Sequence, residues 1–550
     1  MKLDLHSAPD AGLTPALLEA IIDHHERSTL PRLELLWMYY RNPMQSAPGP
    51  ARGADPDGSA RRYRLGQERG LPSRLTGCAG RAWGQLTDDR ALWSRKEVVI
   101  ENDIAWRIHT MVDFMFGRPV AIASGAPDPA KRRLIERVLE AVWEASGGIA
   151  LMQDIALLGH VYGHVDLIVR VVDRPARGTD SDPSDQPNPG DDETVTRAAK
   201  CVRVEVVEPT RGVALLNEQD YRKISAYVLR YRRQTRSVRR PGVGEEFAAG
   251  VRSAGSGLLR RLMGNAGRAQ DPVSAPSRES VIVTEVLTGA WRQVFEHPGD
   301  ERGGVPRLVE EGPALVDASR PIGLGPPVVH IQNISQPFVY EGLGEVEPLV
   351  PLQDELNTRL SDRASRVTLA SFKMLLAKGL SDVEGLAVAP GVVWQTDNPD
   401  ARVESFGGDA SSPSEDRHVE EIREAMDKVS GVPPLAAGVV RAKIGNLSSE
   451  NALRVTLMGL LSKTARKRVG YGHGIGEACR LILEALDRLG ILATTDQERT
   501  ARVEWPDPLP RDERDALDAA ARKIELGVSR ERVLAELGYT SSREPTPPVE

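Results

Sequence analysis

The spacing of apolar residues predicts helices in the first third of the chain. Apolar positions recur every three or four residues, the period of one face of an α-helix. The predicted helices span residues 14–41, 98–116, 128–145 and 149–159. In the first of them, Thr14 can cap the N-terminus, and Pro31 predicts a break or kink because proline has no backbone N–H.

The period then changes to the alternation that is typical of half-buried strands. β-Branched and polar residues alternate over residues 161–172 and 201–232, and further strands are predicted over 281–295 and 326–331. Stretches rich in Gly, Pro, Ser, Asp or Arg interrupt this pattern and predict long loops. These loops span residues 42–80, 173–196 and 234–279. The last is interpreted as a solvated surface insertion, with a dedicated DNA-binding arm as the alternative.

A long helix without any internal breaker is predicted over residues 351–378. About 28 residues at the rise of an α-helix make a rod of roughly 40 Å. One face carries a sparse apolar stripe and the opposite face is charged. The stripe consists of Leu352, Leu356, Leu360, Val367 and Met374, and the charged residues are Arg359, Asp362, Arg363 and Arg366. Such a narrow stripe suits packing against neighbouring helices rather than burial inside one globule.

A β-hairpin is predicted directly after this helix. Residues 391–396 and 401–406 flank the turn-rich sequence Asp397-Asn398-Pro399-Asp400, which would form an acidic tip. Helices are then predicted over residues 414–430 and 448–489, and a short helix and a helix-turn-helix-like piece follow residue 508. We interpret the basic residues Lys463, Arg466, Lys467 and Arg468 as a solvated helix face. The last ten residues are expected to be disordered.

Helices and strands therefore both contribute, which makes the predicted fold class α+β, and 550 residues suggest three or four domains.

The chain has 71 Lys and Arg against 78 Asp and Glu, a net charge of −7, which argues against tight general binding of DNA. Cys78, Cys201 and Cys479 show no spacing typical of metal sites or disulfide frameworks. No signal-peptide pattern or membrane-length apolar run is found, so we expect a soluble intracellular product.

Catalytic motifs are absent from the sequence, with one candidate for metal binding. There is no phosphate-binding GxxxxGK[ST] loop, no GxSxG and no HExxH. His160, His164 and Asp166 have a spacing that could hold a metal ion if both imidazoles lay on one helix face. The alternative interpretation of the whole chain is therefore a metal-dependent hydrolase acting on nucleic acid. Ordinary surface histidines are the competing interpretation of this motif.

Several segments, taken in order, resemble portal proteins of tailed double-stranded DNA bacteriophages of the siphophage type. They include the paired Tyr39 and Tyr40 and a helix that starts after Asn102 and is closed by Gly117-Arg118-Pro119. The similar segments are residues 35–41, 101–120, 159–165, 327–333, 349–362, 448–453 and 503–529. Together they extend over most of the chain, and the long loops are where it departs from the family.

This resemblance implies the portal fold, in which a helical and β-rich wing, a β-containing clip, a long stem helix and a helical crown assemble into a ring. It implies a helical part of the wing at 1–160, a β-rich wing and clip at 161–335, and a stem helix at 340–378. A hairpin with a tunnel loop would follow at 379–412, wing and crown helices at 413–500, and C-terminal helices with a disordered tail at 501–550.

In function, the resemblance implies a ring, typically dodecameric, at one vertex of the capsid of a phage or prophage. Genomic DNA would pass through its channel during packaging and ejection. The implied partners are the terminase large subunit, the major capsid or scaffold protein and a head-completion adaptor protein, with no membrane. The implied location is the virion, with assembly in the host cytoplasm.

The resemblance also assigns roles to particular residues. It places the turn Asp397, Asn398, Pro399 and Asp400 in the channel as a tunnel loop, and Leu352, Leu356, Leu360 and Val367 at contacts between stem helices. No enzyme activity, catalytic residue, metal or cofactor is expected.

Overall fold

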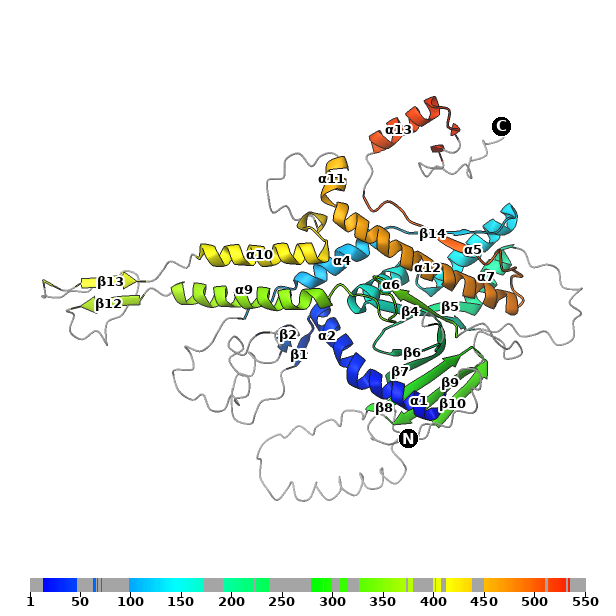
Figure 1. Ribbon diagram of the computed structural model, residues 1–550, viewed down its shortest axis with the longest axis horizontal. Helices are drawn as coiled ribbons and strands as arrows, with labels where there is room; N and C mark the ends of the chain where they lie inside the picture. The colour runs from blue at the N-terminus through cyan, green and yellow to red at the C-terminus, as the bar shows by residue number, and fades with distance from the viewer. Residues whose placement is uncertain are drawn as a thin grey trace, which may run out of the picture.

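The computed structural model combines a helix-rich body, a separate antiparallel sheet and a long protruding arm (Figure 1). It describes residues 13–46, a few residues of 63–71, and residues 98–172, 191–236, 278–313, 326–378, 399–437, 450–509 and 513–534, apart from short gaps inside these ranges. The predicted mixture of helices and strands is confirmed. Among the described residues, no helix is both long enough and apolar enough to cross a membrane.

The first predicted helix is interrupted, as the proline indicated. It divides into α1 (Pro15–His24), a π-helical turn (His25–Thr29) and α2 (Leu30–Arg41). In the π-turn the N–H of Leu30 donates to the carbonyl of His25, five residues back. Pro31 has no backbone N–H to donate, and its ring crowds the preceding turn. The helical hydrogen bonds just before it therefore span five residues instead of four. As predicted, the Thr14 side chain caps α1 by accepting from the N–H of Leu17.

A three-stranded antiparallel sheet lies at the centre of the body, in the order β11-β4-β5. Its strands are β4 (His164–Val171), β5 (Val202–Val207) and β11 (Val328–Gln332). Five helices surround it: α4 (Asp103–Phe116), α5 (Pro129–Ser146), α6 (Gly148–Tyr162), α7 (Asp191–Cys201) and α12 (Met458–Arg488). Their apolar faces share one core that draws buried residues from Leu33 to Leu492.

The predicted loop at 173–196 is partly wrong, because α7 begins at Asp191. Its first turn is acidic, which complements the positive end of a helix dipole, and Ala198 and Cys201 are buried in the main core. The Asp- and Gly-rich composition just before the helix concealed its start. Most residues of the loops predicted at 42–80 and 234–279 lie outside the described residues.

A second, five-stranded antiparallel sheet has the order β10-β9-β8-β7-β6. Its strands are β6 (Gly212–Leu216), β7 (Ile224–Arg236), β8 (Arg278–Thr288), β9 (Trp291–Pro298) and β10 (Arg307–Pro313). Helix α1 covers one face through a small core that includes Leu18, Ile22 and Phe295. The single long strand pattern predicted over 201–232 is therefore three strands, β5, β6 and β7, which belong to two sheets.

The remaining elements are short sheets and C-terminal helices. β1 (Met44–Ser46) pairs with β2 (Tyr63–Leu65), and β3 (Ala121–Ser124) pairs with β14 (Ala501–Glu504). The helix predicted at 448–489 divides into α11 (Glu450–Thr456) and α12, and α13 (Glu513–Glu525) follows β14. The β3–β14 pair joins the C-terminal part of the chain to its N-terminal helical part.

Candidate channel segment

The arm is an antiparallel pair of helices continued by a β-hairpin (Figure 1). Helix α9 (Val350–Ser371) leaves the body after a 3-10 turn (Glu347–Leu349), and α10 (Pro413–Ser430) returns to it and ends in a second 3-10 turn (Pro434–Ala437). Beyond α9, β12 (Met374–Lys378) pairs with β13 (Arg402–Phe406).

Two predictions for this region need correction. The stem helix ends at Ser371 rather than 378, because residues 374–378 form backbone hydrogen bonds with a strand that lies far ahead in the sequence. The hairpin partner of 402–406 is therefore 374–378 and not 391–396. Residues 391–396 lie outside the described residues. Because β12 ends at Lys378 and β13 begins at Arg402, more of the sequence separates the paired strands than the predicted four-residue tip.

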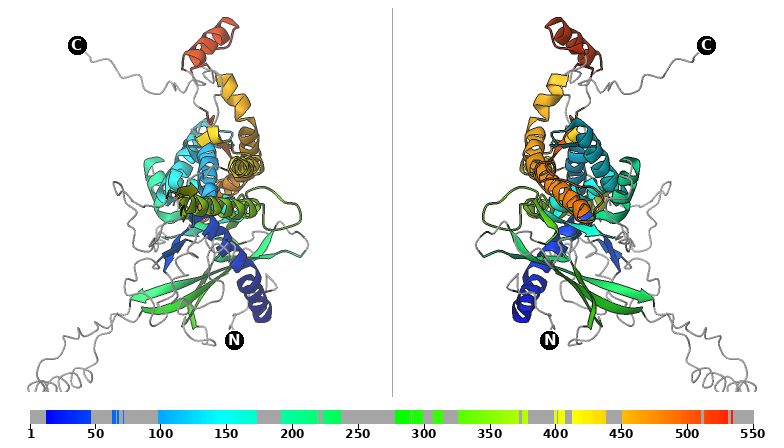
Figure 2. Two further views of the ribbon diagram at one scale, coloured as in Figure 1. Left: turned by 90° about the vertical axis from the view of Figure 1, so that its left-hand side faces the viewer. Right: turned by 90° about the vertical axis from the view of Figure 1, so that its right-hand side faces the viewer.

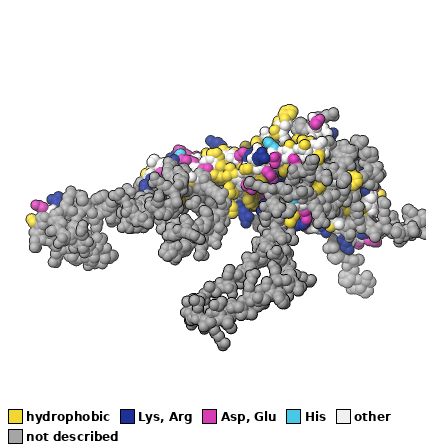
Figure 3. Space-filling model, turned by 90° about the horizontal axis from the view of Figure 1, so that it is seen from below, with side chains coloured by type: hydrophobic (Ala, Val, Ile, Leu, Met, Phe, Trp, Pro, Cys, Tyr) yellow, Lys and Arg dark blue, Asp and Glu magenta, His cyan; other side chains and the backbone are white. Residues whose placement is uncertain are grey.

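Arginines of the arm are paired with carboxylates. Arg363 lies 3.1 Å from Asp416 of α10, Arg366 pairs with Glu415, and Arg359 lies 2.7 Å from Glu355. Side chains of both signs also alternate over the described surface in Figure 3. The stem arginines are thus neutralised locally, which weakens their attraction for a nucleic-acid backbone.

A ladder of buried amide and hydroxyl groups fixes the base of α9. Gln353, Asn357 and Ser361 are four residues apart, so they share one face of the helix, and all three have 0% exposure. The segment before α4 lies along this face: Gln353 accepts from the N–H of Asp103 (3.1 Å), Asn357 from that of Glu101 (3.0 Å) and Ser361 from that of Val99 (2.9 Å). The Gln353 amide donates in return to the carbonyl of Glu101. Side chains of α9 therefore satisfy the backbone groups of the segment that leads into α4.

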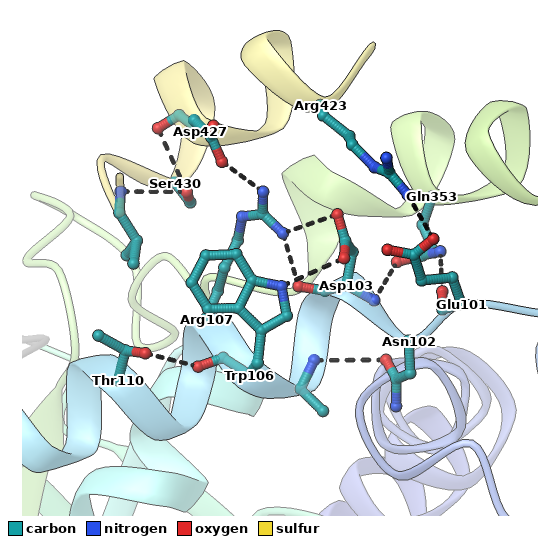
Figure 4. Close-up of polar contacts among 12 residues, drawn as sticks. Glu101, Asn102, Asp103, Trp106, Arg107, Thr110, Gln353, Arg423, Asp427 and Ser430 are labelled. Carbon is teal, nitrogen blue, oxygen red and sulfur yellow. Dashed lines mark hydrogen bonds and ion pairs between the residues drawn. The ribbon is translucent and has the colours of Figure 1, made fainter. Parts of the chain in front are cut away.

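A buried arginine links α4 to α10 beside this ladder (Figure 4). Arg107, with 0% exposure, donates to the Asp103 carbonyl (2.7 Å) and to Asp427 Oδ1 of α10 (2.5 Å), and its Nη1 lies 3.1 Å from Asp103 Oδ2. Its guanidinium lies 4.3 Å from the ring centre of Trp106, whose indole N–H donates to Asp103. Because buried charges are costly unless they are paired, this geometry holds α10 in one position on the body.

A further buried ionic cluster attaches α12 to the segment that leads into α9. Both oxygens of buried Glu345 are paired, with Lys463 at 2.5 Å and Lys467 at 2.7 Å. Burial lowers the pKa of Lys467 to about 8. Burial alone would raise the pKa of Glu345, but the two ammonium groups lower it below its usual value. The interpretation of 463–468 as a solvated face is therefore wrong for these lysines, while Arg466 is exposed.

The candidate metal ligands are not brought together. His160 lies at the end of α6, where its Nδ1 bonds to the Ala156 carbonyl, and Gly163 then turns the chain with φ 95° before β4 begins. Asp166 is saturated instead by the hydroxyls of Tyr227 (2.7 Å) and Tyr340 (2.8 Å) and by His330 Nδ1 (2.7 Å). Within the described part of the chain, no group of three His, Cys, Asp or Glu residues could hold a metal.

The expected stem contacts differ in accessibility. Leu356 has 0% exposure inside the subunit, Leu352 and Leu360 are half-buried against the main core, and Val367 is 43% exposed. The burial of Leu356 is thus accounted for within one subunit. At the expected tunnel loop, Pro399 and Asp400 are exposed, while Asp397 and Asn398 lie outside the described residues.

Sequence reasoning missed the ladder and the buried Arg107. The spacing of Gln353, Asn357 and Ser361 was available in the sequence, since polar residues four apart define a helix face. The sequence did not indicate the partner segment, because that segment lies about 250 residues away in the chain, as the Gln353–Asp103 bond shows.

A match to one family model supports the portal resemblance. Residues 316–541 match the family described as phage portal protein, SPP1 Gp6-like. Among solved structures, the chain is similar to a protein of the virion of a native gene transfer agent particle, with 13% identity, TM-score 0.40, and coverage of 86% of this chain and 98% of the other. It is also similar to a protein of the neck of an empty gene transfer agent particle, with 13% identity, TM-score 0.41, and coverage of 84% and 97%. No curated protein matches the chain.

The family match over residues 316–541 confirms the resemblance to phage portal proteins that the sequence indicated. The matched range contains the entry into α9, the whole arm, and helices α11 to α13. No finding supports the alternative of a metal-dependent hydrolase.

Proposed function

We propose that copies of this chain form a ring at one vertex of a phage or prophage capsid, and that genomic DNA passes through the central channel during packaging and ejection. The ring would be a dodecamer, located in the virion and assembled in the host cytoplasm. The terminase large subunit, the major capsid or scaffold protein and a head-completion adaptor would be its partners.

The observation that carries this proposal is the arm and its anchors. α9 and α10 project from the body as a straight pair, and three buried polar groupings, the ladder, Arg107 and Glu345, fix where the pair leaves it. Stable positioning of a protruding element suits a wall built from repeated copies, since each arm must meet its neighbours at the same angle. Contacts that repeat under rotation close into a ring.

The charge pattern of the arm fits DNA that slides rather than binds. Arg359, Arg363 and Arg366 are each paired with a carboxylate. Tight phosphate contacts would have to break at every step of translocation, so neutralised arginines favour passage. We propose that the turn containing Asp397 and Asp400 lines the channel as a tunnel loop, where its carboxylates would repel phosphates.

We propose a structural and not an enzymatic role, with the energy for translocation supplied by the terminase. The experiment that tests the function is reconstituted packaging. Empty capsids assembled with this chain should protect DNA from nuclease in the presence of terminase and ATP, and capsids assembled without it should not. Equal protection in both would refute the proposal.

A further inference from the structure

A small pocket opens at the C-terminal end of α4, where two other segments of the chain meet this helix. It has a volume of about 110 Å³, and its polar lining residues are Asp113, Arg118 and Arg468. Its walls come from the end of α4, from α12 and from the segment that follows β14. That segment leads towards α13, and Figure 2 shows α13 and the five-stranded sheet on opposite sides of the body. None of the lining residues takes part in the anchors of the arm.

The two arginines of the pocket donate to carbonyl groups. Arg468 Nη2 donates to the carbonyl of Phe114 (3.0 Å), and Arg118 Nη1 donates to that of Asp507 (3.3 Å). The Nε of Arg468 is buried and has no acceptor in the part of the chain that the structure describes. Because a guanidinium has five N–H donors, each arginine can still donate to a ligand in the pocket.

The nearby carboxylates do not neutralise these arginines. Asp507 lies 2.5 Å from Arg454, with which it forms an ion pair. Burial lowers the pKa of Arg468, and the charge of Asp507 offsets this only in part. Burial raises the pKa of Asp113, and the charge that opposes this rise is that of His109 rather than that of an arginine of the pocket. The positive charge at the pocket therefore exceeds the negative charge that faces it.

The size and the apolar part of the lining narrow the class of ligand. A water molecule takes up about 30 Å³ in the liquid, so the pocket has room for about four waters or for one small acidic group, and not for a nucleotide. Its apolar lining consists of Phe114, Met115, Pro506 and Pro508. Carboxylates and phosphates both accept paired hydrogen bonds from a guanidinium. A phosphate would gain nothing from the apolar lining, whereas the methylene groups of an aliphatic acid can pack against it.

We propose that this pocket binds a carboxylate group on a short aliphatic stem, with Arg118 and Arg468 as its hydrogen-bond donors. The ligand is either the glutamate side chain of another polypeptide or a free aliphatic acid, since both present the same chemical group. The site gives a role to Arg118 in the sequence Gly117-Arg118-Pro119, which follows α4. It is independent of the ring and the channel proposed above.

Met115 lines the pocket, so its methyl group reports on binding there. The full-length chain labelled with ¹³C-methyl methionine is titrated with sodium butyrate at constant ionic strength, and Met115→Leu identifies the Met115 signal. This signal should shift until the site is saturated, with a dissociation constant in the millimolar range that suits so small a ligand.

Two arginine variants test whether the shift comes from the proposed donors. Arg118→Gln should weaken butyrate binding roughly 10-fold, because a charge-assisted hydrogen bond is lost. Arg118 is exposed, so this variant should fold as wild type does. Arg466→Gln removes an exposed arginine of α12 outside the pocket and should bind butyrate as wild type does. Butyramide, which lacks the charge, should leave the Met115 signal in place.

A further probe separates the two sources of the carboxylate. If the peptide acetyl-Gly-Glu-Gly-amide binds more tightly than butyrate, the site takes a glutamate side chain. If butyrate binds as tightly or more tightly, a free acid suffices, and both results support the proposal. A Met115 signal that moves with neither carboxylate, an affinity that Arg118→Gln leaves unchanged, or an equal affinity for inorganic phosphate would each overturn it.

Discussion

Removing the buried cation at the base of the arm should be strongly destabilising. Replacement of Arg107 by methionine keeps most of the apolar volume but leaves Asp103 and Asp427 without the guanidinium that lies 3.1 Å from one and 2.5 Å from the other. The side chain of Arg107 is 0% exposed and those of the two carboxylates are 5% and 17% exposed, so water can replace little of what is lost. Breaking a buried pair in this way costs about 3–5 kcal/mol.

A matched control is the exposed pair of Arg502 and Glu504. Their side chains are 80% and 56% exposed at a distance of 3.4 Å, and loss of such a pair costs less than about 1 kcal/mol. Arg502→Met therefore removes the same kind of charge as Arg107→Met, but from an exposed ion pair instead of a buried one. Adding Asp427→Asn to Arg107→Met should recover part of the stability, because it removes one of the two carboxylates that lose the guanidinium.

Urea unfolding followed by tryptophan fluorescence provides the measurement. Trp106, which lies 4.3 Å from the Arg107 guanidinium, is one of the eight tryptophans that contribute to this signal. The Arg107→Met midpoint should shift to lower urea far more than the Arg502→Met midpoint. If the two variants unfold at the same urea concentration, the ion cluster does not hold α4 to α10, and the anchoring argument is refuted.

Three further predictions concern the channel, the chemistry and the pH dependence. Replacing Asp397 and Asp400 with Lys should leave assembly intact but slow or stall DNA packaging, because new phosphate contacts would form; packaging at the normal rate and to full length would remove this turn from the channel. The purified protein should show no ATPase activity, since the sequence contains no phosphate-binding loop; turnover that is lost on mutating a residue of this chain would overturn that claim. Burial lowers the pKa of His160 to about 3 and that of His164 to about 4, from 6.5, so unfolding releases neutral imidazoles that then take up protons. The stability that they contribute is therefore present above about pH 6.5 and is lost as the pH falls towards 4; unfolding midpoints measured over this range should decrease, and His160→Gln should decrease less steeply than wild type.

Local patterns in the sequence were sufficient for most helices. The apolar periodicity of α4, α5, α6 and α10 lies within each segment, and the caps Thr14 and Asp128 mark two starts. Where a distant partner decides the structure, the pattern was not enough. Residues 374–378 continue a helical pattern but pair with 402–406, and interstrand hydrogen bonds outweigh weak helix preference.

Charged and polar residues were the hardest to interpret from sequence. Lys463 and Lys467 resemble a surface patch until Glu345, 118 residues before Lys463, is seen between them. His160 and His164 have metal-like spacing, but the left-handed Gly163 separates them onto a helix and a strand. In both cases the sequence showed which chemical group was present, but it did not show which other residues that group would contact in the fold.

The ring is the central claim, and imaging the purified full-length chain by negative-stain electron microscopy tests it most directly. We expect closed rings with a central channel and uniform subunit number, and light scattering should report a mass many times 60.0 kDa. A particle that remains a 60.0 kDa monomer across a wide range of protein and salt concentrations would contradict it.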